Sequence, residues 1–168
     1  FILRIAVAFI LHIVSLSDYS HMPDWTSHPG FFIADGWGYS DNGWLDIAPR
    51  LIRGIPLDVN ILKRISISGT VGTYDFINGW VYLFVGFSPL TLFFLNCFIG
   101  SITAIFIYFL SMRLFDREVS RTAAILCSFW PSIFLWSTQN LKEPLTLFAV
   151  VLCFWALIAF MKKFNPLY

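Results

Sequence analysis

Charged residues are scarce in this sequence, and their scarcity excludes most soluble classes of protein. Asp, Glu, Lys and Arg together make up 12% of the 168 residues, against roughly 25% in a typical soluble domain. Hydrophobic residues make up 58%, and the mean hydropathy is +0.74. The formal net charge of +1 leaves no basic surface of the kind that binds nucleic acid. The composition therefore predicts an integral membrane protein whose partners include the lipid bilayer and no nucleic acid.

Cysteine is also scarce, with three residues in the whole chain. Cys97, Cys127 and Cys153 lie in separate apolar segments, where a thiol behaves as a small buried hydrophobic group. The sequence therefore predicts neither a disulfide framework nor a metal site made of cysteines.

Long apolar segments dominate the rest of the chain, and we expect four of them to cross the membrane, at 1–17, 90–112, 122–137 and 144–161. A span needs about 20 predominantly apolar residues, and 90–112 contains no charge along its whole length. Segment 1–17 is shorter, and a secretory signal is the alternative. Only Ser15-Leu16-Ser17 resembles a cleavage site there, which disfavours the signal. Pro131 is expected to kink the third segment.

Residues 18–88 are rich in Gly, Pro, Asn and charged residues, so we expect one long loop outside the hydrocarbon core. Two short interfacial helices are predicted within it, near 44–53 and 74–86. In the first, Asp46 and two arginines share one face opposite an apolar face, as in an amphipathic helix. The second has about 13 residues and is too short to cross the membrane.

Positive charge predicts which side of the membrane each loop occupies. A basic hairpin at 113–121 and a lysine pair at 162–163 flank the last two apolar segments. Because cytoplasmic loops are enriched in Lys and Arg, both are predicted to be cytoplasmic. The long loop and the link 138–143 then lie on the outer side. The loop carries Asp35 among aromatic residues, and the link carries Glu143.

Several short motifs follow one another along the chain. They are Asp35-x-x-x-Tyr39, Leu83-Phe-Val-Gly-Phe-Ser-Pro89, Tyr108-x-x-x-x-Arg113-Leu-Phe, Ala123-Ala-Ile-Leu126, Trp130-Pro131 and Trp136-Ser-Thr-Gln-Asn-Leu-Lys-Glu-Pro144. None is specific alone, but their order and spacing extend over nearly the whole chain. By these motifs the chain resembles the N-terminal third of a GT-C glycosyltransferase. The group it resembles is the polyprenyl-phosphate-sugar-dependent branch, which includes protein O-mannosyltransferases and aminoarabinose transferases.

The resemblance implies an enzyme that moves a sugar from a polyprenyl phosphate to a glycan, lipid or protein acceptor, with inversion, at the outer face of a bacterial plasma membrane. It gives Asp35 the role of the base that takes a proton from the acceptor hydroxyl, and it places Glu143 near the donor phosphate. Asp41 is an alternative base in the same loop. The residues available to bind the substrates are Tyr39, Gln139, Asn140, Lys142 and either Arg50 or Arg53.

The resemblance also implies the fold, an all-α integral membrane domain over 1–168 that forms the N-terminal part of a longer polypeptide. No metal or other cofactor is expected. Related oligosaccharyltransferases that bind a divalent metal pair two acids in the second outer loop, where this chain has only Glu143. The competing class is a non-catalytic helical membrane subunit or a transporter fragment whose outer loop binds a partner.

Simpler structural roles are open for the same residues. Asp35 with Gly36 is a common turn dipeptide, and Glu143 with Asn140 resembles a helix capping box. A metal site can also be drawn from His21, Asp24 and His28, with Asp18 nearby, but their spacing matches no strong ligand pattern.

Overall fold

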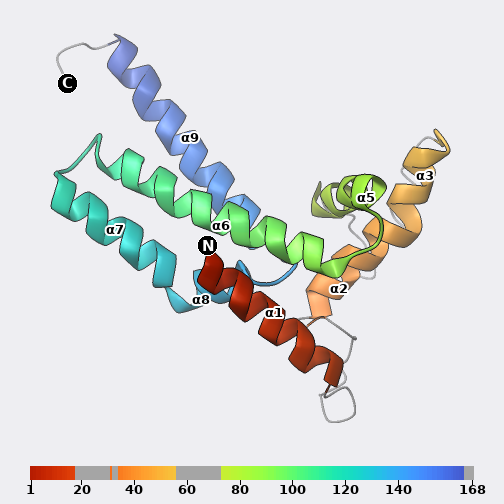
Figure 1. Ribbon diagram of the computed structural model, residues 1–168. Helices are drawn as coiled ribbons and strands as arrows, with labels where there is room; N and C mark the ends of the chain where they lie inside the picture. Colours follow the sequence, from red (N-terminus) through yellow and green to blue (C-terminus); the bar gives the residue numbers. More distant parts are fainter. Residues whose placement is uncertain (18–30, 32–33, 56–72, 165–168) are drawn as a thin grey trace.

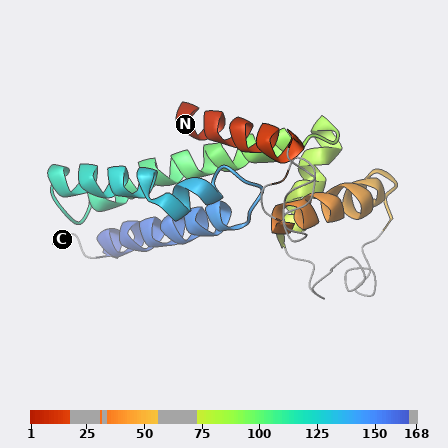
Figure 2. The same ribbon diagram turned by 90° about the horizontal axis from the view of Figure 1, so that it is seen from below.

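The computed structural model describes residues 1–17, 31, 34–55 and 73–164. Most of these residues, 84%, are helical, in agreement with the predicted all-α class. A bundle that contains the longest helices meets a second group of helices at one end (Figures 1 and 2). The bundle contains α1 (Ile2–Ser17), α6 (Pro89–Ser111), α7 (Arg117–Phe129), α8 (Pro131–Trp136) and α9 (Glu143–Phe164), and the end group contains α2 (Ala34–Asp41), the π-helix η1 (Asn42–Ile47), α3 (Ala48–Ile52) and α5 (Thr73–Val85).

Two of the described helices are long and apolar enough to cross a membrane, α6 over Pro89–Ser111 and α9 over Glu143–Met161. They correspond to the second and fourth predicted spans. The prediction of four spans is not met in the described part of the chain. The apolar part of α1, Ile2–Leu16, falls short of that length, and the predicted span 122–137 is divided between α7 and α8.

The division between α7 and α8 occurs at Trp130, whose backbone is extended (φ −60°, ψ 122°). Proline disfavours the α conformation in the residue before it, because its ring clashes with that residue's backbone. Pro131 is itself well placed as the first residue of α8, where its missing N–H removes no helical hydrogen bond. The predicted kink is therefore a complete break, and it interrupts the third apolar segment.

Helix α6 is the centre of the bundle, and it contacts α1, α7 and α9. Ala8 of α1 and Phe93 of α6 are fully buried where these two helices meet. Phe31 packs edge to face on Phe93, with 5.5 Å between ring centroids. At the opposite end of α6, the Arg113 guanidinium lies 4.6 Å from the centroid of the Trp155 ring, which joins the basic hairpin to α9.

The end group depends on a close approach of α5 to the rod formed by α2, η1 and α3 (Figure 1). A Cβ atom on Gly79 of α5 would lie 2.5 Å from Cγ2 of Ile47. A Cβ atom on Gly43 of η1 would lie 2.8 Å from Cβ of Asn78. Because only glycine fits at these distances, both residues allow the two helical backbones to touch.

The polar stripe of α5, which consists of Asp75, Asn78, Gly79 and Tyr82, faces this contact and is buried by it. Asp75 is 1% exposed and accepts a hydrogen bond from the Asn42 side-chain amide at 3.2 Å. Tyr82 is hydrogen-bonded through its hydroxyl to the hydroxyl of Ser40 on α2. These contacts join α5 to the rod through polar groups rather than through apolar packing alone.

Gly79→Ala is expected to lower the free energy of unfolding by about 1–3 kcal/mol, because the added methyl group overpacks the contact with Ile47. The matched control is Gly38→Ala in α2, where an added Cβ would meet nothing within 4 Å. That change should be neutral or stabilising by up to about 1 kcal/mol, since alanine favours helix more than glycine does. Thermal unfolding in detergent, followed by circular dichroism, distinguishes the two. Equal melting temperatures would contradict a close contact of α5 with η1.

Candidate functional site

The link between α8 and α9 was predicted at 138–143, and in the structure it comprises residues 137–142. It lies where the end group meets the bundle. Its first five residues are buried, so its backbone polar groups need partners inside the protein. Asn96 of α6 supplies two of them. Its Nδ2 donates to the carbonyl oxygen of Gln139 at 2.5 Å and to that of Leu141 at 2.8 Å. The side-chain amide of one bundle helix therefore fixes the path of the link.

Asn140 joins the link to the end group. Its Nδ2 donates to the carbonyl oxygen of Gly36 in α2 at 2.8 Å, and its Oδ1 accepts from the Tyr74 hydroxyl of α5 at 2.8 Å. A Cβ atom on Gly36 would lie 2.9 Å from the Asn140 carbonyl oxygen. The Tyr74 hydroxyl also lies 3.1 Å from Oδ1 of Asn96. Burial raises the pKa of Tyr74 well above its usual range, so this phenol stays a hydrogen-bond donor.

Tyr39 of α2 and Lys142 of the link form a hydrogen-bonded pair beside this network. The Tyr39 ring packs edge to face on Tyr74, with 5.3 Å between centroids. Burial raises the pKa of Tyr39. The pKa of Lys142 is raised by the Tyr39 oxygen first, and then by the carboxylates of Glu143 and Asp35. At neutral pH the pair is therefore a neutral phenol next to an ammonium cation.

Both predicted acids lie near this pair. Asp35 is exposed in the first turn of α2, and Glu143 is the first residue of α9. Each carboxylate acts electrostatically on both Tyr39 and Lys142. The structure thus brings together, on one surface, four predicted site residues from two distant parts of the chain.

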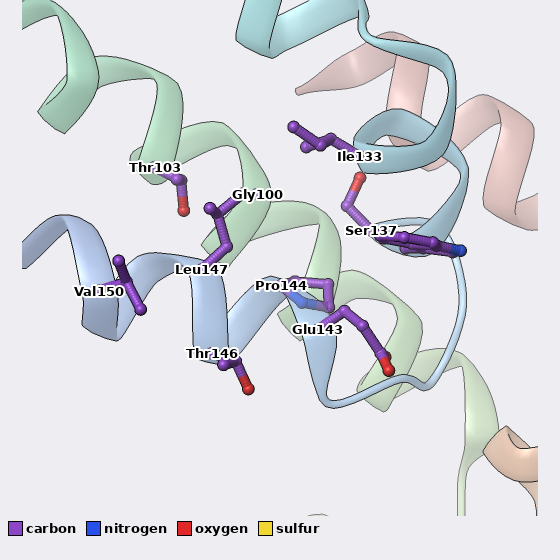
Figure 3. A pocket seen from close by; sticks show the side chains of 10 residues that line it. Gly100, Thr103, Ile133, Ser137, Glu143, Pro144, Thr146, Leu147 and Val150 are labelled. Carbon is purple, nitrogen blue, oxygen red and sulfur yellow. The ribbon is translucent and has the colours of Figure 1, made fainter.

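An apolar groove extends from Glu143 along the bundle between α6, α8 and α9 (Figure 3). It has a volume of about 340 Å³ and is lined by Gly100, Thr103, Ile133, Trp136, Ser137, Glu143, Pro144, Thr146, Leu147 and Val150. Oε2 of Glu143 is buried and has no hydrogen-bond partner among the described residues. The groove therefore combines an apolar wall with a buried carboxylate oxygen of Glu143 at one end.

Three predicted site residues lie away from the Tyr39–Lys142 pair. Asp41, at the end of α2, acts on the pKa of Tyr82, which burial raises to about 12. Arg50 and Arg53 are at the far end of the rod. Arg50 is fifteen residues beyond Asp35, or roughly 20 Å at the rise of a helix. The structure does not bring either arginine to the surface that carries Asp35 and Glu143.

The two amides predicted to bind substrate hold the link in place instead. Asn140 uses its side chain on Gly36 and Tyr74. Gln139 is 2% exposed, and its Nε2 donates to the carbonyl oxygen of Thr138 at 3.0 Å. Tyr74 and Asn96, which were not among the predicted site residues, complete this network. The sequence held a signal for Asn96, because it is a polar residue inside a charge-free apolar segment. Such residues usually form hydrogen bonds to a neighbouring helix.

The described residues contain no group of three His, Cys, Asp or Glu side chains that could hold a metal ion. The alternative metal site drawn from His21, Asp24 and His28, with Asp18, lies outside the described residues.

A comparison with models of protein families matches residues 72–168 to the family described as dolichyl-phosphate-mannose-protein mannosyltransferase. The chain belongs to this family. It is therefore a membrane glycosyltransferase of the mannosyltransferase type, and its resemblance to the GT-C superfamily is confirmed. The mannosyltransferase match includes α5, α6, the link and α9, whereas Asp35 and Tyr39 precede it. Comparisons with curated proteins and with solved structures each gave no match.

Proposed function

We propose that this mannosyltransferase-family protein transfers a sugar from a polyprenyl-phosphate donor to an acceptor hydroxyl at the outer face of a bacterial plasma membrane. The observation that supports it is the meeting of Asp35 and Glu143 at the Tyr39–Lys142 pair, beside an apolar groove. An apolar groove suits an isoprenoid chain. A base and a cation at its end suit an acceptor hydroxyl and a departing phosphate.

Asp35 is the proposed base. Its carboxylate is exposed, so an acceptor can approach it from the aqueous side. The carboxylate takes the proton of the acceptor hydroxyl while the hydroxyl oxygen forms a bond to the anomeric carbon. The bond from that carbon to the phosphate oxygen breaks, and its electron pair leaves on the phosphate. Attack opposite the phosphate inverts the anomeric centre. Asp41 is the weaker candidate because it lies towards Tyr82.

Lys142 is the proposed cation for the departing phosphate. Its raised pKa keeps the ammonium group charged, and fixed charge placed where negative charge develops stabilises a transition state. Oε2 of Glu143, which has no hydrogen-bond partner in the described part of the chain, is proposed to accept a hydrogen bond from a donor-sugar hydroxyl. Gln139 and Asn140 are not proposed to bind substrate, because their side chains already form hydrogen bonds within the protein.

The experiment is a transfer assay with the natural full-length protein in its membrane. Radiolabelled mannose is supplied either as polyprenyl-phosphate mannose or as a nucleotide sugar in washed membranes that lack lipid-linked donor. Label is expected to enter the protein, lipid or glycan fraction from the lipid-linked donor alone, with release of polyprenyl phosphate. Absence of transfer from this and other polyprenyl-phosphate sugars would favour the non-catalytic subunit or transporter class.

Tyr39→Phe should move the alkaline limb of the pH–rate profile to lower pH. The Tyr39 oxygen is the largest cause of the raised Lys142 pKa, so its removal returns that pKa towards 10.5, and the ammonium charge is lost at lower pH. Initial rates of sugar transfer measured between neutral and alkaline pH give the limb. Tyr108→Phe, which removes a hydroxyl from α6 away from the pair, is the control. An unmoved limb in Tyr39→Phe would contradict a catalytic Lys142 cation.

A further inference from the structure

Arg4 is a charged residue near the start of the apolar helix α1, and it is 3% exposed. Its guanidinium reaches two other helices. Nη1 donates to the hydroxyl of Ser137, and Nη2 donates to the carbonyl oxygen of Ser128 at 2.9 Å. The guanidinium also lies 5.2 Å from the centroid of the Phe134 ring. Within the described residues, no ion pair joins Arg4 to an acid. Burying a charge in an apolar helix costs free energy, and charges in such positions are usually functional. We therefore asked what the contacts of Arg4 hold in place.

Both hydrogen bonds are made at helix ends. Ser128 lies in the last turn of α7, where the break at Trp130 leaves carbonyl groups without helical partners. Ser137 follows α8 directly and begins the link. While it accepts from Arg4, the Ser137 hydroxyl donates to the carbonyl oxygen of Phe134 at 2.7 Å. The cation thus lies at the C-terminal ends of α7 and α8, where the helix dipole favours positive charge.

Helix α6 leaves room for this arrangement at Gly100. A Cβ atom there would lie 2.7 Å from Cβ of Ser137 and 2.9 Å from Nη1 of Arg4. Any other residue would separate the guanidinium from the serine. Gly100 and Ser137 also line the groove that ends at Glu143, so the same contact sets the position of a groove wall.

We propose that Arg4 is a positioning residue that fixes the first residue of the link and, through it, Lys142 and Glu143. The inference rests on the proposed function. The middle of the link is already fixed on two sides. Asn96 of α6 donates to its backbone, and Asn140 of the link donates to Gly36 of the end group. Arg4 fixes its beginning from α1 and ties α8 to α7 across the break. Without Arg4, α8 turns about the extended Trp130 backbone and carries Ser137 away from α6. A misplacement of about 1 Å at a reacting group reduces rates by about 100-fold.

The test compares Arg4→Met, Arg4→Lys and the packing control Ala8→Val in the natural full-length protein. Ala8 is fully buried between α1 and α6, in an apolar cluster with Phe93 and Cys97. Arg4→Met should lower kcat for sugar transfer about tenfold or more. The KM for the acceptor should stay within about threefold, because Asp35 and Tyr39 are positioned by α2. Arg4→Lys should recover part of the loss, since one ammonium group keeps the charge but not the two-pronged geometry.

Hydrogen exchange measured by mass spectrometry gives a readout that does not depend on activity. In Arg4→Met, the amides of residues 137–142 should exchange faster while those of α6 keep their protection. In Ala8→Val, faster exchange should be confined to α1, with kcat within about threefold of the wild type. Unchanged exchange in the link of Arg4→Met, or the same loss of kcat in Ala8→Val, would overturn the proposal. If the wild type transfers no sugar, the proposed function fails, and the exchange data still decide whether Arg4 positions the link.

Discussion

Asp35→Asn should reduce the rate of sugar transfer by about 100-fold or more, the usual contribution of a general base, while the protein still inserts and folds. Asparagine has almost the size of aspartate but cannot take the proton of an acceptor hydroxyl. The side chain is exposed in the first turn of α2, so little stability depends on it. Initial rates in membranes containing equal amounts of the two proteins, with polyprenyl-phosphate sugar as donor, measure the effect.

The matched control is Asp41→Asn, which makes the same chemical change in the same helix. Asp41 lies towards Tyr82 rather than towards the Tyr39–Lys142 pair, so transfer should stay within about threefold of the wild type. If Asp41→Asn were inactive but normally folded, and Asp35→Asn active, the base would be Asp41. If both variants transferred sugar at the wild-type rate, neither carboxylate would be the base.

Asn96→Asp should lower the free energy of unfolding by about 2–4 kcal/mol, although the two side chains have almost the same volume. The Nδ2 of Asn96 donates to the carbonyl oxygens of Gln139 and Leu141 in a fully buried place. A carboxylate would put an oxygen in the position of that nitrogen. Two carbonyl groups would lose their donor, and a charge would be buried beside them. Thermal unfolding in detergent should show a clear fall in melting temperature.

Ser101→Ala is the control for Asn96→Asp, because Ser101 is also a polar residue of α6. Its hydroxyl donates to the carbonyl oxygen of Cys97 at 2.7 Å within the same helix, so the loss should be under about 1 kcal/mol. A similar small loss in Asn96→Asp would mean that the link is held by other groups.

Helices α6 and α9 could be predicted from the sequence because their length and apolar composition are local properties. The third predicted span failed for a reason that was also local. Trp130 precedes a proline, and the resulting preference for extended backbone outweighs the apolar composition around it. The burial of the polar stripe on α5 could not be predicted from the sequence. Gly43 and Gly79 show the contact between α5 and η1 only when the positions of both helices are known.

The site could be predicted only in part, for reasons that lie in the link. Gln139, Asn140 and Lys142 are equally polar in sequence, so all three were expected to bind substrate. Tertiary packing separates them, because the partners of Asn140 are 104 and 66 residues away in Gly36 and Tyr74. No spacing rule selects such partners. Arg4 could have been noticed as a charge in an apolar segment, but its acceptors come from residues more than 120 positions away.

The hydrogen bond from Asn140 to Gly36 spans 104 residues, which has a consequence for biosynthesis. Synthesis at about 5–20 residues per second separates these two residues by roughly 5–20 s. During that interval α2 has been synthesised, but the amide that will bind its carbonyl group does not yet exist. The bond from Asn140 to Gly36 and the Tyr39–Lys142 pair therefore form only after the segment that follows α8 has been made. The surface proposed for catalysis is assembled late, and a nascent chain arrested before residue 140 inserts helices into the membrane without it.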